Sequence, residues 1–229
     1  ASIIRLAGRR TLVHDMDCIE TLARVATLCV DNTGTITEPT MIVDDIVPLT
    51  PDRFCKDDIR GIMADYVAAM QSDNATMAAL KQYFTGDTRR AAQETMTFSS
   101  AKKYGGVRFH ADETYLLGAP DILLAAHPGA EDVLRQVEAF SAKGCRVLLL
   151  ALYDGSLQDD APTAPLMPLS LILLSNKIRE TAPETFRYFA EQGVAVKVIS
   201  GDNALTVSEV ARRAGIEGAE NYVDARTLQ

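Results

Sequence analysis

The sequence predicts an α/β fold, and three observations lead to that prediction. An apolar run at residues 25–30 is typical of a short buried strand, and Asp31 with a Thr-Gly-Thr turn follows it directly. Later in the chain, strand-like runs at 169–174 and 194–199 flank a helical pattern at 182–191. This alternation predicts a parallel sheet, which we expect to include the strand before Asp31. The intervening residues are therefore expected to form an insertion.

The insertion, about residues 47–170, has helix and strand signals of its own. Apolar periodicity and cap residues predict helices at 57–70, after Asn74, after Pro120 and near 133–140, and strands at 106–110, 113–118 and 145–152. An acidic loop with three prolines follows at 154–168. This mixture predicts an α+β domain that folds by itself.

Composition and charge exclude several classes of function. The 229 residues have a net charge of −8, which disfavours nucleic acid and anionic membrane surfaces as main partners. The four cysteines include no C-x-x-C pair, so we expect neither a disulfide framework nor a metal cage. Cys29 and Cys145 lie in apolar runs and are predicted to be buried thiols. The apolar runs of this chain are shorter than the roughly 20 residues that span a bilayer.

Two strand ends carry residues suited to phosphate chemistry. Asp31 lies where open α/β sheets bind their ligands, and a carboxylate there is suited to attack a phosphoryl group and carry it as an acyl phosphate. Ser200-Gly201-Asp202 ends another strand and precedes a helix capped by Asn203, whose N-terminus favours anions. Singly, the first segment also fits a surface turn and the second a simple helix cap. Together they predict two loops that meet at one phosphate site.

Three segments of the insertion are suited to bind a nucleotide. The segment from Phe98 to Lys103 offers an aromatic ring that stacks on a base and lysines that offset phosphate charge. Gly118 lies in a Gly-Ala-Pro turn that lets the backbone approach a ligand, and Arg146 stands at the start of a strand. Singly, an aromatic residue is more often part of a core, and a lysine pair more often a solvated edge. The order and spacing of the segments carry the prediction.

Taken in order, these motifs resemble a known family. The series D-x-T-G-T, F-S-S-x-x-K, G-A-P, G-x-R-V-L and S-G-D-N, which covers nearly the whole chain, resembles the cytoplasmic part of a P-type cation-transporting ATPase. The resemblance implies a haloacid dehalogenase-like, Rossmann-like phosphorylation domain, which is incomplete here and formed by residues 1–46 and 171–229. A nucleotide-binding domain at residues 47–170 would interrupt it.

The resemblance also implies a role for each matching residue. Asp31 would accept the γ-phosphoryl group of ATP. Asp31 and the backbone carbonyl of Thr33 would help to hold magnesium. Phe98 would stack on adenine, beside Lys103. Further contacts to phosphate, to nucleotide or between the domains are implied for Thr35, Asp73, Gly118, Arg146, Arg179, Gly201 and Asp202. The implied cofactors are ATP and magnesium.

Several positions depart from the family pattern. Phosphatases of this fold have a second aspartate, which acts as general acid and base, at the position of Thr33 in this chain. Because threonine cannot play that part, a long-lived phospho-aspartate is favoured, as in a pump. Asn32 stands where the family has lysine, which removes a cation beside the transferring phosphoryl group. Leu117 and Asn176 replace a lysine and an aspartate, and no G-D-G-x-N-D segment occurs.

The resemblance finally implies a larger protein. We expect the chain to be an excerpt of a membrane protein, at the cytoplasmic face, whose partners are ATP, the actuator and transmembrane domains of the same polypeptide, and a cation bound in the membrane helices. The motifs lean toward calcium as that cation. The excerpt alone is expected to be nearly inactive, and to self-associate or be disordered near residues 1–24 and 203–229. Two alternatives stay open: a nucleotide-binding module without turnover and a haloacid dehalogenase-like phosphatase.

Overall fold

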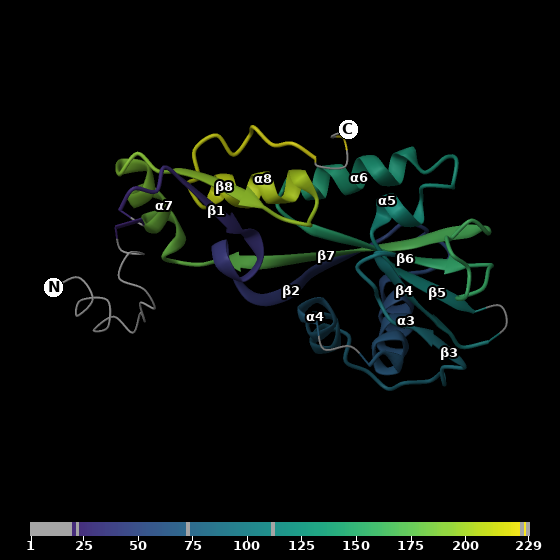
Figure 1. Cartoon of the computed structure of the whole chain (residues 1–229). Helices are drawn as coiled ribbons and strands as arrows, with labels where there is room; N and C mark the ends of the chain where they lie inside the picture. The colour runs from purple at the N-terminus through teal and green to yellow at the C-terminus, as the bar shows by residue number, and fades with distance from the viewer. Residues whose placement is uncertain (1–19, 22, 72–73, 111–112, 225–226, 228–229) are drawn as a thin grey trace.

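The described residues form two lobes that are joined by a long antiparallel ribbon (Figure 1). The computed structural model describes residues 20–21, 23–71, 74–110, 113–224 and 227. The ribbon consists of β2 (Thr37–Pro48) and β7 (Leu166–Ile178), which pair from Thr37 with Ile178 to Pro48 with Ser170. The domain limits expected at residues 47 and 170 fall inside these strands. The expected domains are therefore connected by a two-stranded ribbon rather than by loops. The domain limits themselves stay a prediction.

The larger lobe is built on an antiparallel sheet with the strand order β2-β7-β6-β5-β4-β3. The strands beyond the ribbon are β3 (Glu94–Met96), β4 (Tyr104–Arg108), β5 (Thr114–Gly118) and β6 (Arg146–Tyr153). Helices α3 (Lys56–Ala69) and α4 (Ala75–Tyr83) lie below the sheet in Figure 1, and α5 (Pro120–Leu123) and α6 (Glu131–Ser141) lie above it. Each face therefore has its own apolar core.

Helices α4 and α5 begin where their sequence signals predict. The Asn74 side chain accepts a hydrogen bond from the Met77 amide at 2.8 Å, which caps α4, and Pro120 is the first residue of α5. On α3, Ile59 and Met63 are fully buried in the core beneath the sheet, as the helical spacing predicts. Local sequence signals were therefore sufficient to predict these helices.

The smaller lobe holds a parallel pair of strands covered by helices on one face. Strand β1 (Thr27–Asp31) pairs with β8 (Ala195–Ile199), and helices α7 (Ala182–Glu191) and α8 (Ala204–Arg213) share a core with them. Val30 of β1 packs on that core, whereas Cys29 points to the other face and is exposed. The prediction of a buried Cys29 was therefore wrong, because the alternate residues of this strand face away from the helices. Cys145 is half-buried.

The α/β class is confirmed, but the predicted sheet membership of one strand was wrong. Residues 169–174 were expected in the parallel sheet with β1 and β8, and they belong instead to β7, between β2 and β6 in the antiparallel sheet. Their continuous apolar character reflects burial on both faces, which a central antiparallel strand shares with a parallel one. No helix in the described ranges is long and apolar enough to cross a membrane.

Candidate functional site

The carboxyl ends of β1 and β8 lie side by side and define the first part of the candidate site. The strands pair in parallel with Asp31 opposite Ile199, so the segments that follow, 32–36 and 200–203, leave the sheet at the same edge. Asp31 is exposed, and its Oδ1 accepts a hydrogen bond from the Asn32 amide at 2.8 Å. The carboxylate is therefore open to a ligand rather than turned into the core.

The turn after Asp31, η1 (Asn32–Ile36), is held by Arg179. Gly34 takes a φ of 82°, a conformation that residues with a Cβ rarely adopt, so the turn needs glycine there. The Arg179 guanidinium donates hydrogen bonds to the Gly34 carbonyl at 2.6 Å and to the Thr37 carbonyl at 3.1 Å. Because Arg179 directly follows β7, the end of the ribbon fixes the shape of this turn.

Asp202 connects the turn to the larger lobe. Its Oδ2 accepts a hydrogen bond from Thr33 Oγ1 at 3.4 Å, and its Oδ1 lies 2.8 Å from Arg146 Nη2. Arg146 begins β6, and its Nη1 donates to Thr76 Oγ1 on α4 at 3.5 Å. Predicted site residues from both lobes therefore meet at one carboxylate.

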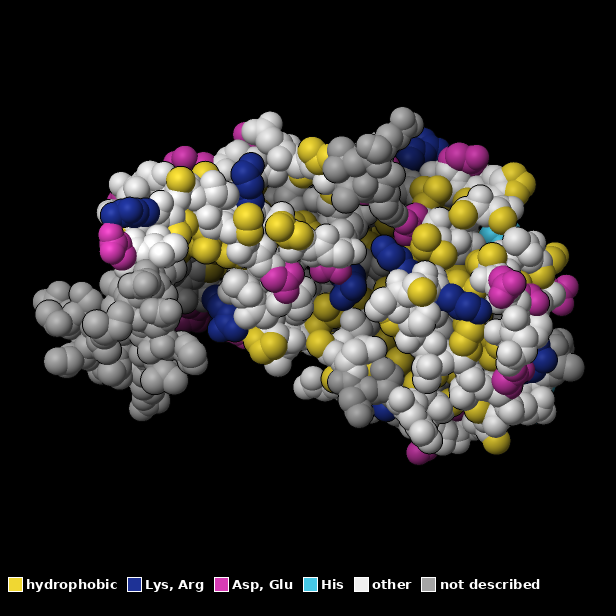
Figure 2. Space-filling model, viewed as in Figure 1, with side chains coloured by type: hydrophobic (Ala, Val, Ile, Leu, Met, Phe, Trp, Pro, Cys, Tyr) yellow, Lys and Arg dark blue, Asp and Glu magenta, His cyan; other side chains and the backbone are white. Residues whose placement is uncertain are grey.

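Two further contacts join the lobes beside this carboxylate. The Thr206 hydroxyl on α8 donates to the Cys145 carbonyl at 3.0 Å, and the Arg213 guanidinium donates to the Lys143 carbonyl at 2.7 Å. In the view of Figure 2, Lys and Arg side chains are visible where the two halves of the molecule meet. Helix α8 thus attaches to the turn that precedes β6.

A charge cluster on α8 supports this attachment. Glu209 accepts hydrogen bonds from Arg212 at 2.8 Å and from Arg213 at 2.7 Å. These bonds, from Arg212 first and then Arg213, lower the pKa of Glu209 to about 2 against the opposing effect of burial. The carboxylate therefore orients the arginine that reaches the larger lobe.

The predicted nucleotide residues of the larger lobe form a second group. The Ala119 amide donates to the Lys103 carbonyl at 3.0 Å, which joins the loop after Phe98 to the end of β5. Only glycine allows this approach, because a Cβ at Gly118 would lie 2.3 Å from Tyr104 Cβ and 2.5 Å from the Lys103 carbonyl oxygen. Lys103 itself has a φ of 59°, which is uncommon for a residue with a side chain. Phe98 is 42% exposed and so is accessible to a ligand.

The structure thus gathers most of the predicted residues into two groups. The first comprises Asp31, Thr33, Arg146, Arg179 and Asp202, and the second comprises Phe98, Lys103 and Gly118. Thr35 and Gly201 are exposed on the two strand-end loops, and Asp73 lies outside the described residues. The roles of all these residues stay predictions.

Sequence reasoning missed two hydroxyl groups at the junction of the lobes. Thr76 contacts Arg146, and Thr206 contacts Cys145, the residue before Arg146. Both lie in the first turn of a helix that an asparagine caps. That position in the helix was the one signal available, and it does not tell which residues the hydroxyls meet.

Asn32 places a neutral, buried amide directly after Asp31. The residue is 5% exposed, and its Oδ1 has no hydrogen-bond partner among the described residues. An unpaired buried acceptor costs about 1–3 kcal/mol. The position next to the candidate nucleophile therefore carries no positive charge.

The donors around Asp31 fit a magnesium ion that is shared with a phosphorylated ligand. Magnesium prefers oxygen ligands, keeps several waters, and is commonly held by one or two carboxylates together with substrate phosphates. The exposed carboxylate of Asp31 and the carbonyl of Thr33 are donors of this kind. In the part of the chain that the structure describes, no cluster of three acidic, histidine or cysteine side chains forms a cage. The ion would therefore need phosphate oxygens to complete its ligands.

The fold and the aspartate at the end of β1 define a protein of the haloacid dehalogenase-like class. The chain matches the haloacid dehalogenase-like hydrolase family over residues 25–228, and it belongs to that family. The matched range includes both lobes and both groups of predicted site residues.

Comparison with curated proteins confirms the resemblance to cation-transporting ATPases. Probable cation-transporting ATPase exp7 of Streptococcus pneumoniae serotype 4 is 38% identical over 230 residues, which cover 99% of this chain and 28% of that protein. The calcium-transporting ATPase CtpE of Mycolicibacterium smegmatis is 40% identical over 232 residues, with 99% and 27% coverage. A potassium-transporting ATPase ATP-binding subunit 1 of Staphylococcus aureus is 27% identical over 227 residues, with 95% and 31% coverage. The chain spans less than a third of the length of these relatives.

Proposed function

We propose that this chain binds ATP and accepts its γ-phosphoryl group on Asp31, as the catalytic part of a P-type cation-transporting ATPase. One observation carries the proposal: Asp202 contacts Thr33 of the turn after Asp31 and, at 2.8 Å, Arg146 of the larger lobe. A nucleotide held by the larger lobe would therefore have its phosphates close to the proposed acceptor.

In the proposed reaction, a carboxylate oxygen of Asp31 attacks the γ-phosphorus of ATP. The bond between that phosphorus and the oxygen bridging to the β-phosphate breaks, and ADP leaves with the electron pair. The product on the protein is an acyl phosphate. Thr33 and the amides of the turn are suited to meet the phosphoryl oxygens, and Arg146 is suited to meet a phosphate once it leaves Asp202.

Asp31 and the Thr33 carbonyl are the residues that would hold magnesium in this scheme. When bound, the ion supplies positive charge next to the transferring phosphoryl group. Phe98 supplies an exposed ring for the adenine, and Lys103 supplies a cation beside it. Their shared loop, joined to Gly118, is the proposed base-binding end of the site.

A second candidate, a nucleotide-binding module without turnover, is favoured by one observation. The buried amide of Asn32 leaves no cation at the position beside Asp31. Charge stabilisation is a main term in phosphoryl transfer, so a neutral group there slows the reaction. ATP would then bind to Phe98 without efficient transfer to Asp31.

Labelled ATP with magnesium separates the two candidates. Phosphoryl transfer predicts label on the protein that hydroxylamine removes and that Asp31→Asn lacks. Label that persists in Asp31→Asn contradicts Asp31 as the acceptor. In a chain completed by the rest of the polypeptide, Asn32→Lys is expected to raise labelling severalfold or more by restoring the cation. ATP affinity that depends on Phe98, without label in either chain, supports the binding module.

The names of the relatives support a proposal for the transported cation and for the location of the whole protein. We propose calcium as the cation and the cytoplasmic face of a membrane as the location, because a relative that is 40% identical is named a calcium-transporting ATPase. Calcium uptake by vesicles that contain the full-length protein tests this proposal. Uptake that is lost in Asp31→Asn supports it, and ATP-dependent uptake of potassium alone contradicts it.

A further inference from the structure

An ion pair between the buried Asp65 and the partly exposed Arg90 ties α3 to the irregular segment that leads into β3. Asp65 on α3 is 2% exposed, and its Oδ1 accepts hydrogen bonds from the backbone amides of Arg89 at 2.7 Å and Arg90 at 3.4 Å. Its Oδ2 lies 3.4 Å from Nε of Arg90. One carboxylate thus holds both the backbone and the side chain of this segment.

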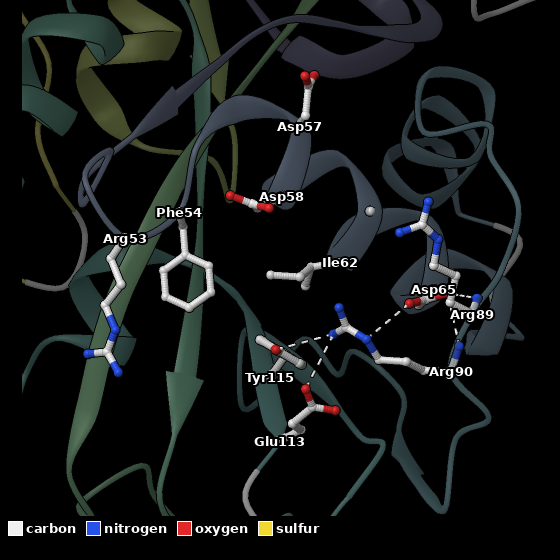
Figure 3. Close-up of a pocket in the computed structure, with 11 residues that line it drawn as sticks. Arg53, Phe54, Asp57, Asp58, Ile62, Asp65, Arg89, Arg90, Glu113 and Tyr115 are labelled. Atoms are coloured by element: carbon white, nitrogen blue, oxygen red, sulfur yellow. Dashed lines mark hydrogen bonds and ion pairs between the residues drawn. The ribbon is translucent and has the colours of Figure 1, made fainter.

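The Arg90 guanidinium extends the network to β5. Its Nη1 donates to the Tyr115 hydroxyl at 3.3 Å and lies 3.9 Å from the Glu113 carboxylate. It also stands 5.8 Å from the ring centres of Phe109 and Tyr115. Figure 3 shows Arg90 between Asp65 and Glu113, on the wall of a cavity of about 260 Å³. Helix α3, the segment before β3 and the start of β5 therefore meet at one side chain.

This network lies at the opposite end of the sheet from the proposed base-binding loop. Glu94, the first residue of β3, pairs with Arg108, which pairs in turn with Thr114 at the start of β5. At the other end of β5, Gly118 pairs with Tyr104. Phe98 follows β3 toward that other end. Arg90 therefore precedes β3 at one end of the strand, and Phe98 follows β3 at the other end.

Strand β3 is short and lies at the edge of the sheet, where Glu94 also contacts Gln158 at 2.5 Å and lies 3.7 Å from Arg108. It is an edge strand of three residues that pairs only with β4 among the described strands. The segment 84–93 before it has no helix or strand of its own. Burying the Asp65 carboxylate costs desolvation energy, and the best-attested benefit of such a buried charge with its partner is to select one arrangement of the groups around it. Here the arrangement selected is the entry of β3 into the sheet.

The geometry points to Asp65 and Arg90 as positioning residues for nucleotide binding: they set where β3 enters the sheet and so where Phe98 stands relative to Gly118. The inference rests on the proposed function, because it takes Phe98 as the residue that stacks on the base. Neither residue of the pair touches the nucleotide in this scheme. They act through the strand between them and Phe98.

A double-mutant cycle on the whole 229-residue chain tests this inference. ATP affinity is measured by calorimetry for Asp65→Asn, for Phe98→Ala and for the double variant, at a temperature where each is folded. Asp65→Asn is expected to weaken ATP binding about tenfold, and Phe98→Ala is expected to cost less in that background than in the parent chain. Asp57→Asn is the matched control, since Asp57 is on the same helix and lines the same cavity but is 88% exposed.

Each outcome of the cycle has a distinct meaning. The positioning role is overturned if Asp65→Asn melts at a lower temperature but binds ATP as tightly as Asp57→Asn. It is also overturned if the losses of ATP affinity from Asp65→Asn and Phe98→Ala are additive in the double variant. Phe98→Ala that leaves ATP affinity unchanged overturns the proposed base-binding loop and the inference with it. If Asp65→Asn shows no cooperative unfolding, Arg90→Lys replaces it, because lysine keeps the charge but cannot span Asp65 and Tyr115 together. ATP affinity about threefold weaker or more in Arg90→Lys supports the role, and unchanged affinity overturns it.

Discussion

Arg146 and Asp202 form an ion pair of 2.8 Å across the junction of the two lobes. Both residues are proposed to contact a nucleotide, yet in this structure they pair with each other. Arg146 also contacts Thr76 of its own lobe, so its side chain is held on both sides. Under the proposed function, ATP phosphates would compete with Asp202 for Arg146, and the ion pair itself is a contact that holds the two lobes together.

Loss of this pair is expected to loosen the junction. Arg146→Met should speed amide hydrogen exchange about tenfold at residues 143–147 and 203–206, because local opening then breaks fewer contacts. Arg135→Met is the control, since Arg135 pairs with Asp132 within α6 and not across the junction. Equal exchange in both variants would show that Thr206 and Arg213 hold the junction without Arg146.

Arg179 is expected to be essential to the turn after Asp31. Arg179→Met removes both hydrogen bonds to the carbonyls of Gly34 and Thr37, and a charged donor to a carbonyl stabilises by roughly 1.5–3 kcal/mol. We expect a loss of about 2 kcal/mol in the free energy of unfolding and at least tenfold less acyl phosphate in the completed chain. Urea unfolding and labelling with ATP measure the two effects.

The neighbouring Lys177 provides the control for Arg179. It is exposed and pairs with Glu180 at 3.1 Å, so Lys177→Met removes a charge near the same turn without touching it. A stability change below about 0.5 kcal/mol is expected there. A similar loss in both variants would mean that net charge near the end of β7, rather than the two hydrogen bonds, matters.

Local elements were predictable because their signals are local. Asn203 accepts hydrogen bonds from the Leu205 and Thr206 amides, as its place before a helical pattern predicts. The convergence of the segments after Asp31 and Ile199 was likewise predictable, since the carboxyl ends of parallel strands share one edge.

Pairing between distant segments was not predictable in the same way. The apolar residues of β7 carry no mark that separates a parallel strand from a central antiparallel one. No strand was predicted at residues 37–48, and their pairing with β7 is what extends the ribbon between the lobes. The contact of Arg146 with Asp202 depends on how that ribbon sets the lobes, and no spacing in the sequence encodes it.

Acid is expected to weaken the attachment of α8. Hydrogen bonds from Arg212 and Arg213 lower the pKa of Glu209 to about 2, against an ordinary value of 4.5. A lowered carboxyl pKa stabilises the fold at pH values above the ordinary one, and that stabilisation is lost as the pH falls from about 5 to about 2. Glu209→Gln should therefore lose about 1 kcal/mol at neutral pH and show a flatter decline of unfolding free energy with acid.

Glu138→Gln is the matched control for this pH dependence. Glu138 is exposed on α6, and no ion pair of its side chain occurs among the described residues. Denaturant unfolding at several pH values should give this variant the slope of the parent chain. A parent slope that Glu209→Gln leaves unchanged would assign the acid sensitivity to other carboxylates.

The last prediction concerns two glycines in opposite surroundings within the larger lobe. A Cβ at Gly118 would lie 2.3 Å from Tyr104 Cβ and 2.5 Å from the Lys103 carbonyl oxygen, so Gly118→Ala must push β4 and β5 apart. We expect a loss of about 2–3 kcal/mol and weaker ATP binding, because the loop that carries Phe98 moves with the strand. Gly61 lies in α3 with no atom within 4 Å of such a Cβ, so Gly61→Ala should stabilise by about 0.5–1 kcal/mol through its helix propensity. Thermal unfolding with ATP titration distinguishes them: equal and small effects of both substitutions would contradict the close approach of Lys103 to Gly118 on which the base-binding loop depends.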